Sequence, residues 1–250
     1  LSGCNSDGPV VEQPEKTYYD LAQRRMKANN FFSAIESLQA IEARYPFGRY
    51  AEQAQSELIY AYFMNSEDEA AHEAAEKFIR LNPRHPNIDY AYFMKGIASY
   101  TRDKGAFARV FKSDLSNRDI SGAKQAFGEL SEFLTRFPQS QYAPYASQRL
   151  IYLRSLIAKN ELVAADYYMK RKAYVAALRR AKYVIENIPN TSETIRALKV
   201  ARDCYKELGY PELMDDIQIV IDANDTSAEA ESQKGSWNFF QRKAPAPSKS

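Results

Sequence analysis

Residues 34–46 read Ala-Ile-Glu-Ser-Leu-Gln-Ala-Ile-Glu-Ala-Arg-Tyr-Pro, and the pattern in this stretch decides the fold. Small or apolar side chains stand twelve, eight and five residues before the proline, at Ala34, Leu38 and Ile41. Spacings of three, four and seven place these positions on one face of a helix. Proline lacks an N–H donor and disfavours helix in the residue before it, so Pro46 is expected to end the helix.

The same pattern occurs three more times, before Pro83, Pro138 and Pro189. The corresponding positions, all small or apolar, are Ala71, Ala75 and Phe78, then Ala126, Leu130 and Phe133, then Ala177, Ala181 and Val184. Each of these helices is preceded by another amphipathic segment. A helix pair closed by proline, with alanine where the two helices cross, resembles the tetratricopeptide repeat (TPR) pattern.

We therefore predict an all-α, elongated TPR-type array of about five helix pairs, or ten helices. A charged segment, 101–120, is expected to form an extended loop. Pro144 is expected to open a long helix that reaches about Lys170 and joins two halves of the array. The predicted parts are a flexible tether (1–16), N-terminal repeats (17–141), the connecting helix with C-terminal repeats (142–224) and a tail (225–250).

The tail is rich in Ser, Ala, Lys and Gln, a composition typical of disorder. Within it, Trp237-Asn238-Phe239-Phe240 forms an apolar island. This island predicts either a short docking motif or a segment without a role, and one sequence leaves both readings open.

Composition and motifs argue against an enzyme and against a nucleic-acid-binding protein. The 34 Lys and Arg residues are interspersed with 32 Asp and Glu, without the basic stripe that nucleic acids require. The two histidines, His72 and His85, lack partners at metal-ligand spacing, so neither a metal nor a cofactor is expected. We expect His85 to order a turn. Phosphate-binding glycine loops and nucleophile-elbow motifs are missing from the sequence.

The first four residues, Leu-Ser-Gly-Cys, match a bacterial lipobox. We expect Cys4 to carry the acyl lipid and to anchor the chain, with a chance match as the alternative. Asn5 permits sorting to the outer membrane. No stretch is apolar enough for a transmembrane helix, and Cys204 is expected to be a small buried side chain.

Three loop sequences are more specific than a helix stop requires. They are residues 44–48 (Arg-Tyr-Pro-Phe-Gly) with Tyr50, residues 78–90 (Phe-Ile-Arg-Leu-Asn-Pro-Arg-His-Pro-Asn-Ile-Asp-Tyr) and residues 137–142 (Phe-Pro-Gln-Ser-Gln-Tyr). With Leu-Ile-Tyr-Ala-Tyr at 58–62, they closely resemble the BamD family, also called ComL or YfiO. The resemblance runs from the lipobox to about Ala223. Lys172 stands where this family often has glycine, which predicts a softer kink after the long helix.

The resemblance implies a non-enzymatic lipoprotein scaffold of the β-barrel assembly (BAM) complex, on the periplasmic face of the outer membrane. Its C-terminal repeats would bind the last POTRA domain of BamA, alongside other Bam lipoproteins. Arg179 and Arg180 are the candidate residues, Arg180 being the aligned one. We expect Arg180→Glu to weaken BamA binding and to leave the fold intact.

The resemblance also implies that the N-terminal repeats receive the C-terminal targeting strand of unfolded β-barrel clients. The candidate residues are Arg44, Tyr45, Phe47, Arg49, Tyr50, Tyr60 and Tyr62. Aromatic and arginine side chains suit an extended peptide that ends in an aromatic residue and a carboxylate. Tyr60 or Tyr62 could instead be inter-repeat core, whereas Phe47 and Arg49 are the better groove candidates. The alternative function is a TPR lipoprotein acting as a secretin pilotin or cell-envelope coordinator, which leaves the loop sequences unexplained.

Overall fold

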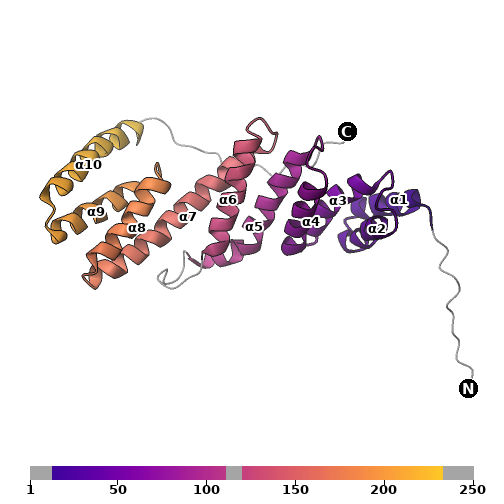
Figure 1. The fold of residues 1–250 in the computed structure, drawn as a ribbon, viewed down its shortest axis with the longest axis horizontal. Coiled ribbons are helices and arrows are strands. Elements are labelled where there is room, and N and C mark those ends of the chain that lie inside the picture. Colours follow the sequence, from indigo (N-terminus) through magenta and orange to yellow (C-terminus); the bar gives the residue numbers. More distant parts are fainter. Residues whose placement is uncertain (1–12, 111–119, 233–250) are drawn as a thin grey trace, which may run out of the picture.

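The computed structural model describes residues 13–110 and 120–232, with side chains described over 13–102 and 120–224. These residues form ten helices and no strand. The helices are α1 (Glu15–Lys27), α2 (Phe31–Arg44), α3 (Ala51–Met64), α4 (Asp68–Leu81), α5 (Ile88–Val110), α6 (Ser121–Arg136), α7 (Ala143–Lys170), α8 (Tyr174–Asn187), α9 (Thr194–Leu208) and α10 (Pro211–Ser232). Figure 1 shows them stacked into an elongated array with α1 and α10 at opposite ends. The predicted all-α repeat array is confirmed.

The helix face predicted from the four prolines is buried. All twelve of its positions, in α2, α4, α6 and α8, are at most 1% exposed. Each of these helices ends two residues before its proline. The intervening residue has φ between −125° and −132° and ψ between 49° and 57°, outside the helical region as a following proline requires. Proline therefore sets the ends of α2, α4, α6 and α8.

The turns inside the helix pairs share a second geometry. Asn29, Ser66, Lys172 and Gly209 each follow a first helix with φ between 55° and 78°. In all four turns the next N–H donates to the carbonyl five residues earlier at 2.9 Å, which is the Schellman end of a helix. The softer kink expected at Lys172 is wrong, because the lysine adopts the same left-handed turn as Gly209. Its Cβ makes that conformation costly.

Three predicted boundaries are corrected by the structure. The loop expected over 101–120 is wrong for 101–110, which continue α5, and the disordered tail is wrong for 225–232, which complete α10. Both segments contain helix-favouring Ala, Glu, Lys or Arg, and charge alone does not end a helix. The helix α1 begins at Glu15, directly after Pro14, so the tether is shorter than predicted. Three segments lie outside the described residues: 1–12, 111–119 and 233–250. The predicted lipid-bearing Cys4 lies in the first of them, and the apolar island around Trp237 lies in the last.

Aromatic side chains and close helix approach build the central core. Phe93 on α5 stacks on Tyr142 with ring centroids 4.7 Å apart and also contacts Phe133 at 5.6 Å. A Cβ added at Gly96 would lie 2.6 Å from the Leu130 side chain on α6, so α5 and α6 meet where only glycine fits. The 28-residue helix α7, with Pro144 in its first turn as predicted, continues this core towards α8 and α9.

A polar network lies between α4, α5 and α6. The His72 Nε2 atom is 2.8 Å from one Glu129 carboxylate oxygen, and the Ser99 hydroxyl donates to the other at 2.6 Å. The hydrogen bond to Glu129 raises the pKa of His72. Burial alone would raise the pKa of Glu129, but the hydrogen bonds from His72, Ser99 and Gln125 outweigh it and lower that pKa. The pair therefore favours a charged imidazolium and a charged carboxylate inside the array.

Two smaller predictions from the sequence are confirmed. The Asn87 N–H donates to His85 Nδ1 at 3.1 Å, so His85 orders the turn before α5. Its ring also packs edge-on against Phe78, with centroids 5.1 Å apart. Cys204 is buried with a free thiol. Burial raises the pKa of this thiol to about 11.

Candidate functional site

The loop between α2 and α3 holds four of the seven candidate client-binding residues, and a fifth, Arg44, is the last residue of α2. Phe47 is 100% exposed and Arg49 is exposed. The N–H groups of Arg49 and Tyr50 both donate to the Glu15 carboxylate, at 3.1 and 2.7 Å. Gly48 lies against the same carboxylate, which is 2.2 Å from the position that a Cβ would take. The first turn of α1 thus fixes the loop backbone and leaves the Phe47 side chain in solvent.

The other aromatic and arginine side chains of this loop pack on α1. Tyr50 stacks on Tyr19 with ring centroids 4.4 Å apart. Arg44 donates to the Tyr18 hydroxyl at 2.6 Å and lies over its ring. The Tyr45 hydroxyl donates to the backbone carbonyl of Gln13 at 2.7 Å. These contacts leave Tyr45 and Tyr50 half-buried, whereas Arg44, Phe47 and Arg49 are exposed.

Tyr60 and Tyr62 lie elsewhere on α3. Tyr60 packs edge-on against Phe31, with centroids 5.8 Å apart. Tyr62 accepts a hydrogen bond from Gln39 at 2.6 Å and lines a recess of 180 Å³ between α2, α3 and α4. Ten residues separate Tyr60 from Tyr50, about 15 Å along a helix. The seven candidates therefore form a loop surface and a separate pair on α3, and no single groove joins them in the described side chains.

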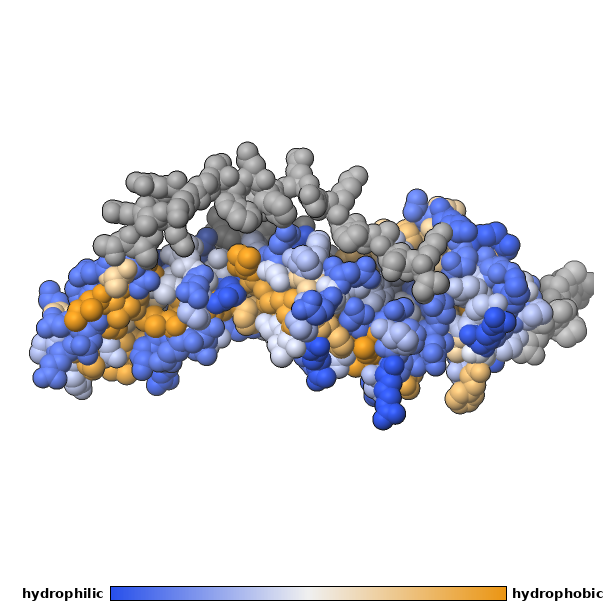
Figure 2. Space-filling view, turned by 90° about the horizontal axis from the view of Figure 1, so that it is seen from above, coloured by the Kyte–Doolittle hydropathy of each residue, from blue (hydrophilic) through white to orange (hydrophobic). Residues whose placement is uncertain are grey.

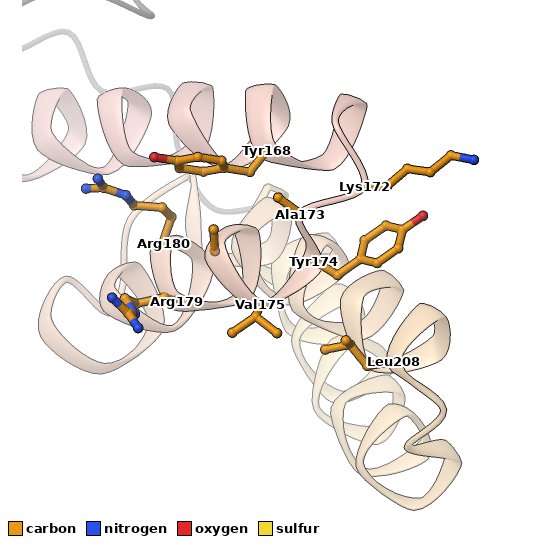
Figure 3. Close-up of a pocket in the computed structure, with 9 residues that line it drawn as sticks. Tyr168, Lys172, Ala173, Tyr174, Val175, Arg179, Arg180 and Leu208 are labelled. Carbon is orange, nitrogen blue, oxygen red and sulfur yellow. The ribbon is translucent and has the colours of Figure 1, made fainter.

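A larger depression, of 530 Å³, lies between the end of α7, the start of α8 and the end of α9. Figure 3 shows Val175 of α8 and Leu208 of α9 directed towards each other across it. Arg179 and Arg180 leave α8 in different directions, and the Arg180 guanidinium lies beside the hydroxyl end of Tyr168. Val175 is 62% exposed, and Lys172 and Arg179, which also line the depression, are exposed. The surface combines an apolar floor with a basic rim.

The two candidate arginines differ in their surroundings. Arg180 donates to Glu161 of α7 at 2.9 Å, and this hydrogen bond raises the pKa of Arg180. Glu161 is only 3% exposed, and its carboxylate also accepts a hydrogen bond from the Lys124 ammonium of α6 at 2.9 Å. The carboxylate thus joins three consecutive helices. Arg179 is exposed beside this cluster. Because a buried carboxylate without partners is costly, we expect Arg180 to stabilise the fold. We therefore now expect Arg180→Glu to destabilise the fold, whereas the sequence alone led us to expect that the fold would stay intact.

Several residues of this surface were not predicted from the sequence. Val175, Leu208 and Tyr168 reach one depression from three helices, which no local pattern reveals. Glu161 could have been noticed in the sequence, because this carboxylate lies on the apolar face of α7 between Ala158 and Leu162, which are both 0% exposed. A charge in that position requires partners.

Two other kinds of site are absent from the described residues. Across 13–110 and 120–232, no helix is both long and apolar enough to cross a membrane. Among the described side chains, at 13–102 and 120–224, no three His, Cys, Asp or Glu residues are grouped so that they could hold a metal ion.

The fold defines the class of protein: a helical-repeat protein of the TPR type. Residues 11–218 match the family described as YfiO, outer membrane lipoprotein, and the chain belongs to this family.

Named relatives cover nearly the whole chain. The outer membrane protein assembly factor BamD of Vibrio cholerae is 33% identical over 225 residues, which is 90% of this chain and 93% of the relative. The BamD of Neisseria meningitidis serogroup A is 34% identical over 231 residues, 90% of this chain and 86% of the relative. A solved structure of MamA from Desulfovibrio magneticus RS-1 covers 91% of this chain at 11% identity, with a TM-score of 0.38.

Proposed function

We propose that this chain is a non-enzymatic scaffold of the BAM complex that assists the insertion of β-barrel proteins into the outer membrane. The observation that carries the proposal is a similarity to BamD proteins over 90% of the chain, on a helical array with a separate surface in each of its two halves. The acyl lipid on Cys4 would hold the array on the periplasmic face of the outer membrane. Each half would then engage a different protein.

In the C-terminal half, the depression between α7, α8 and α9 would receive the last POTRA domain of BamA. Its apolar floor would take an apolar side chain, and the basic rim would face an acidic group of the partner. Arg179 is the arginine that is accessible to such a group, whereas Arg180 is held by Glu161. The two arginines would therefore contribute differently: Arg179 by contact and Arg180 by positioning α8 on α7.

Copurification of BamA from detergent-solubilised outer membranes tests this assignment. We expect Arg179→Glu to reduce the BamA recovered with this chain, because it reverses the charge at the accessible rim. The matched control is Lys27→Glu, which reverses an exposed cation at the far end of the array. Equal BamA recovery with the two variants would contradict the assignment, and recovery of a secretin in place of BamA would favour the alternative function.

In the N-terminal half, the loop between α2 and α3 would receive the C-terminal strand of an unfolded client. The exposed Phe47 ring offers an aromatic contact, and the Arg49 guanidinium can pair with a terminal carboxylate. We expect Phe47→Ala to weaken the binding of a synthetic barrel-protein C-terminal peptide, as measured by fluorescence anisotropy. Phe32→Ala is the matched control, since Phe32 is also exposed, at 64%, but lies at the other end of α2. Equal affinities for the two variants would contradict the loop assignment.

A further inference from the structure

The loop between α2 and α3, residues 45–50, takes its backbone acceptor from another helix. Tyr50 is the N-cap of α3 and makes no side-chain capping hydrogen bond. In a capping box, the third residue of the same helix accepts a hydrogen bond from the N-cap N–H. Gln53 occupies that position, but its side chain donates to Glu57 at 2.9 Å. The N–H groups of Arg49 and Tyr50 donate to Glu15 of α1.

The loops before α5 and α7 use acceptors of their own. The Asn87 N–H donates to His85 Nδ1 at 3.1 Å, and the Tyr142 N–H donates to the Ser140 hydroxyl at 3.3 Å. Each of these acceptors lies two residues from its donor. The acceptor for the α2–α3 loop lies 34 residues from Arg49, on α1. The conformation of this loop therefore depends on the position of α1.

Specific side-chain contacts hold α1 beside the loop. Ala22 alone among the residues of α1 is buried. The Tyr19 hydroxyl and the Gln23 amide both donate to Glu57 of α3, at 3.0 and 2.6 Å. Figure 2 shows the end of the molecule that carries α1 as mainly hydrophilic on the face drawn, with apolar surface gathered towards the other end. Polar contacts thus place the Glu15 carboxylate against the loop backbone.

This arrangement leaves the arginines of the loop surface available to a client. The guanidinium carbons of Arg44 and Arg49 lie over the rings of Tyr18 and Tyr50, at 5.3 and 6.0 Å from the centroids. Glu15 bonds the loop backbone. A terminal carboxylate of a client could therefore pair with either arginine without displacing Glu15. The geometry favours a glutamate that positions the loop over one that competes with the client.

We infer that Glu15 is a positioning residue for client binding, which holds the α2–α3 loop in the conformation that presents Phe47 and Arg49. The inference rests on the proposed role of this loop in receiving the C-terminal strand of a client. Ordering a loop costs conformational entropy, so a loop that is ordered in advance binds an extended peptide more tightly. Loss of Glu15 leaves the contacts of a bound peptide unchanged but lowers the fraction of chains that are ready to bind.

The binding kinetics of the full chain with a fluorescent barrel-protein C-terminal peptide test this role. We expect Glu15→Ala to weaken the affinity roughly fivefold, as the loss of a helix cap does. The association rate should fall and the dissociation rate should stay unchanged. Phe47→Ala removes a contact of the bound peptide, so it should raise the dissociation rate. Glu52→Ala is the matched control, because it removes an exposed carboxylate from the first turn of α3, and both rates should stay unchanged.

A double-mutant cycle with Gly48 separates positioning from general stability. A Cβ at Gly48 would overlap the Glu15 carboxylate, whose atoms are the three nearest to that position. Gly48→Ala should therefore push Glu15 off the loop and slow association about fivefold as well. In the Glu15→Ala background these atoms are gone, so Gly48→Ala should have little further effect. Two variants that merely destabilised the fold would instead have additive effects, and that result would contradict the inference.

The remaining outcomes separate this inference from the proposed function. Unchanged association rates for Glu15→Ala and Gly48→Ala, together with weaker binding by Phe47→Ala, would overturn the inference and leave the proposed role of the loop in place. Tighter binding by Glu15→Ala would also overturn it, because the glutamate would then compete with the client carboxylate. Unchanged binding by Phe47→Ala would contradict the proposed role of the loop itself, and the inference with it.

Discussion

Charge reversal at Arg180 tests whether this arginine stabilises the fold through Glu161 or serves only to contact a partner protein. Arg180→Glu places a carboxylate beside Glu161, which is only 3% exposed. Removing one partner of a buried charge costs about 3–5 kcal/mol. Lys124 still neutralises Glu161 at 2.9 Å, and the Arg180 side chain is 43% exposed, so solvent screens part of the effect. We expect the free energy of unfolding to fall by about 2–3 kcal/mol.

Urea unfolding followed by circular dichroism measures this loss, with Arg179→Glu as the matched control. Arg179 is exposed one residue away, so its reversal should change the free energy of unfolding by no more than about 0.5 kcal/mol. Glu161→Gln removes the buried charge from the Arg180→Glu background. We expect the two substitutions to be non-additive by about 1 kcal/mol or more, because they act on one network. Equal midpoints for the two arginine variants, or strict additivity with Glu161→Gln, would refute the reasoning.

Three further predictions concern stability. Lys172→Gly should raise the free energy of unfolding by about 1 kcal/mol, because it relieves a left-handed residue at φ 59°. Gly96→Ala should lower it by about 1–3 kcal/mol through the clash on α6, whereas Gly128→Ala, where a Cβ meets nothing within 4 Å, should raise it by about 0.5–1 kcal/mol. The contribution of His72 to the free energy of unfolding should be complete below pH 6.5 and should be lost as pH rises through its elevated pKa. The contribution of Glu129 should be complete above pH 4.5 and should be lost as pH falls through its lowered pKa.

Unfolding midpoints measure all three. A lower midpoint for the glycine variant of Lys172 would show that the turn is not strained. Equal unfolding midpoints for Gly96→Ala and Gly128→Ala would contradict the close approach of α5 and α6 at Gly96. For the polar network, the free energy of unfolding of the unaltered chain should fall relative to that of His72→Gln as pH rises above 6.5. Parallel pH profiles would mean that the imidazole does not titrate in contact with Glu129.

The repeat architecture was predictable because it depends on local chemistry. Proline ends a helix wherever it occurs, and small side chains recur where two helices must approach. The face containing Ala34 and its eleven counterparts is therefore visible in the sequence and buried in the structure. The ends of α5 and α10 were harder to predict, because charged and small residues such as those at 101–110 and 225–232 are compatible with both helix and loop.

The binding surfaces were predictable only in part. Arg179 and Arg180 are neighbours in sequence, yet Arg180 is held by a residue nineteen positions away on another helix. The same limit applies to Tyr60 and Tyr62, whose surroundings depend on α2 and α4. Long-range packing decides which of two similar side chains is accessible, and helical periodicity does not contain that information. Phe47 was easier to assign, because a residue in a short loop after a helix-ending proline has few neighbours to cover it.

Site-specific photo-crosslinking in intact cells tests most directly whether the two halves of the array bind different proteins. A crosslinker placed at Phe47 reports on the loop between α2 and α3, and one placed at Val175 reports on the depression beside α8. We expect the crosslinker at Val175 to capture BamA and the crosslinker at Phe47 to capture unfolded outer-membrane β-barrel proteins, as identified by mass spectrometry. Capture of one and the same partner at both positions, or of a secretin at Val175, would contradict this expectation.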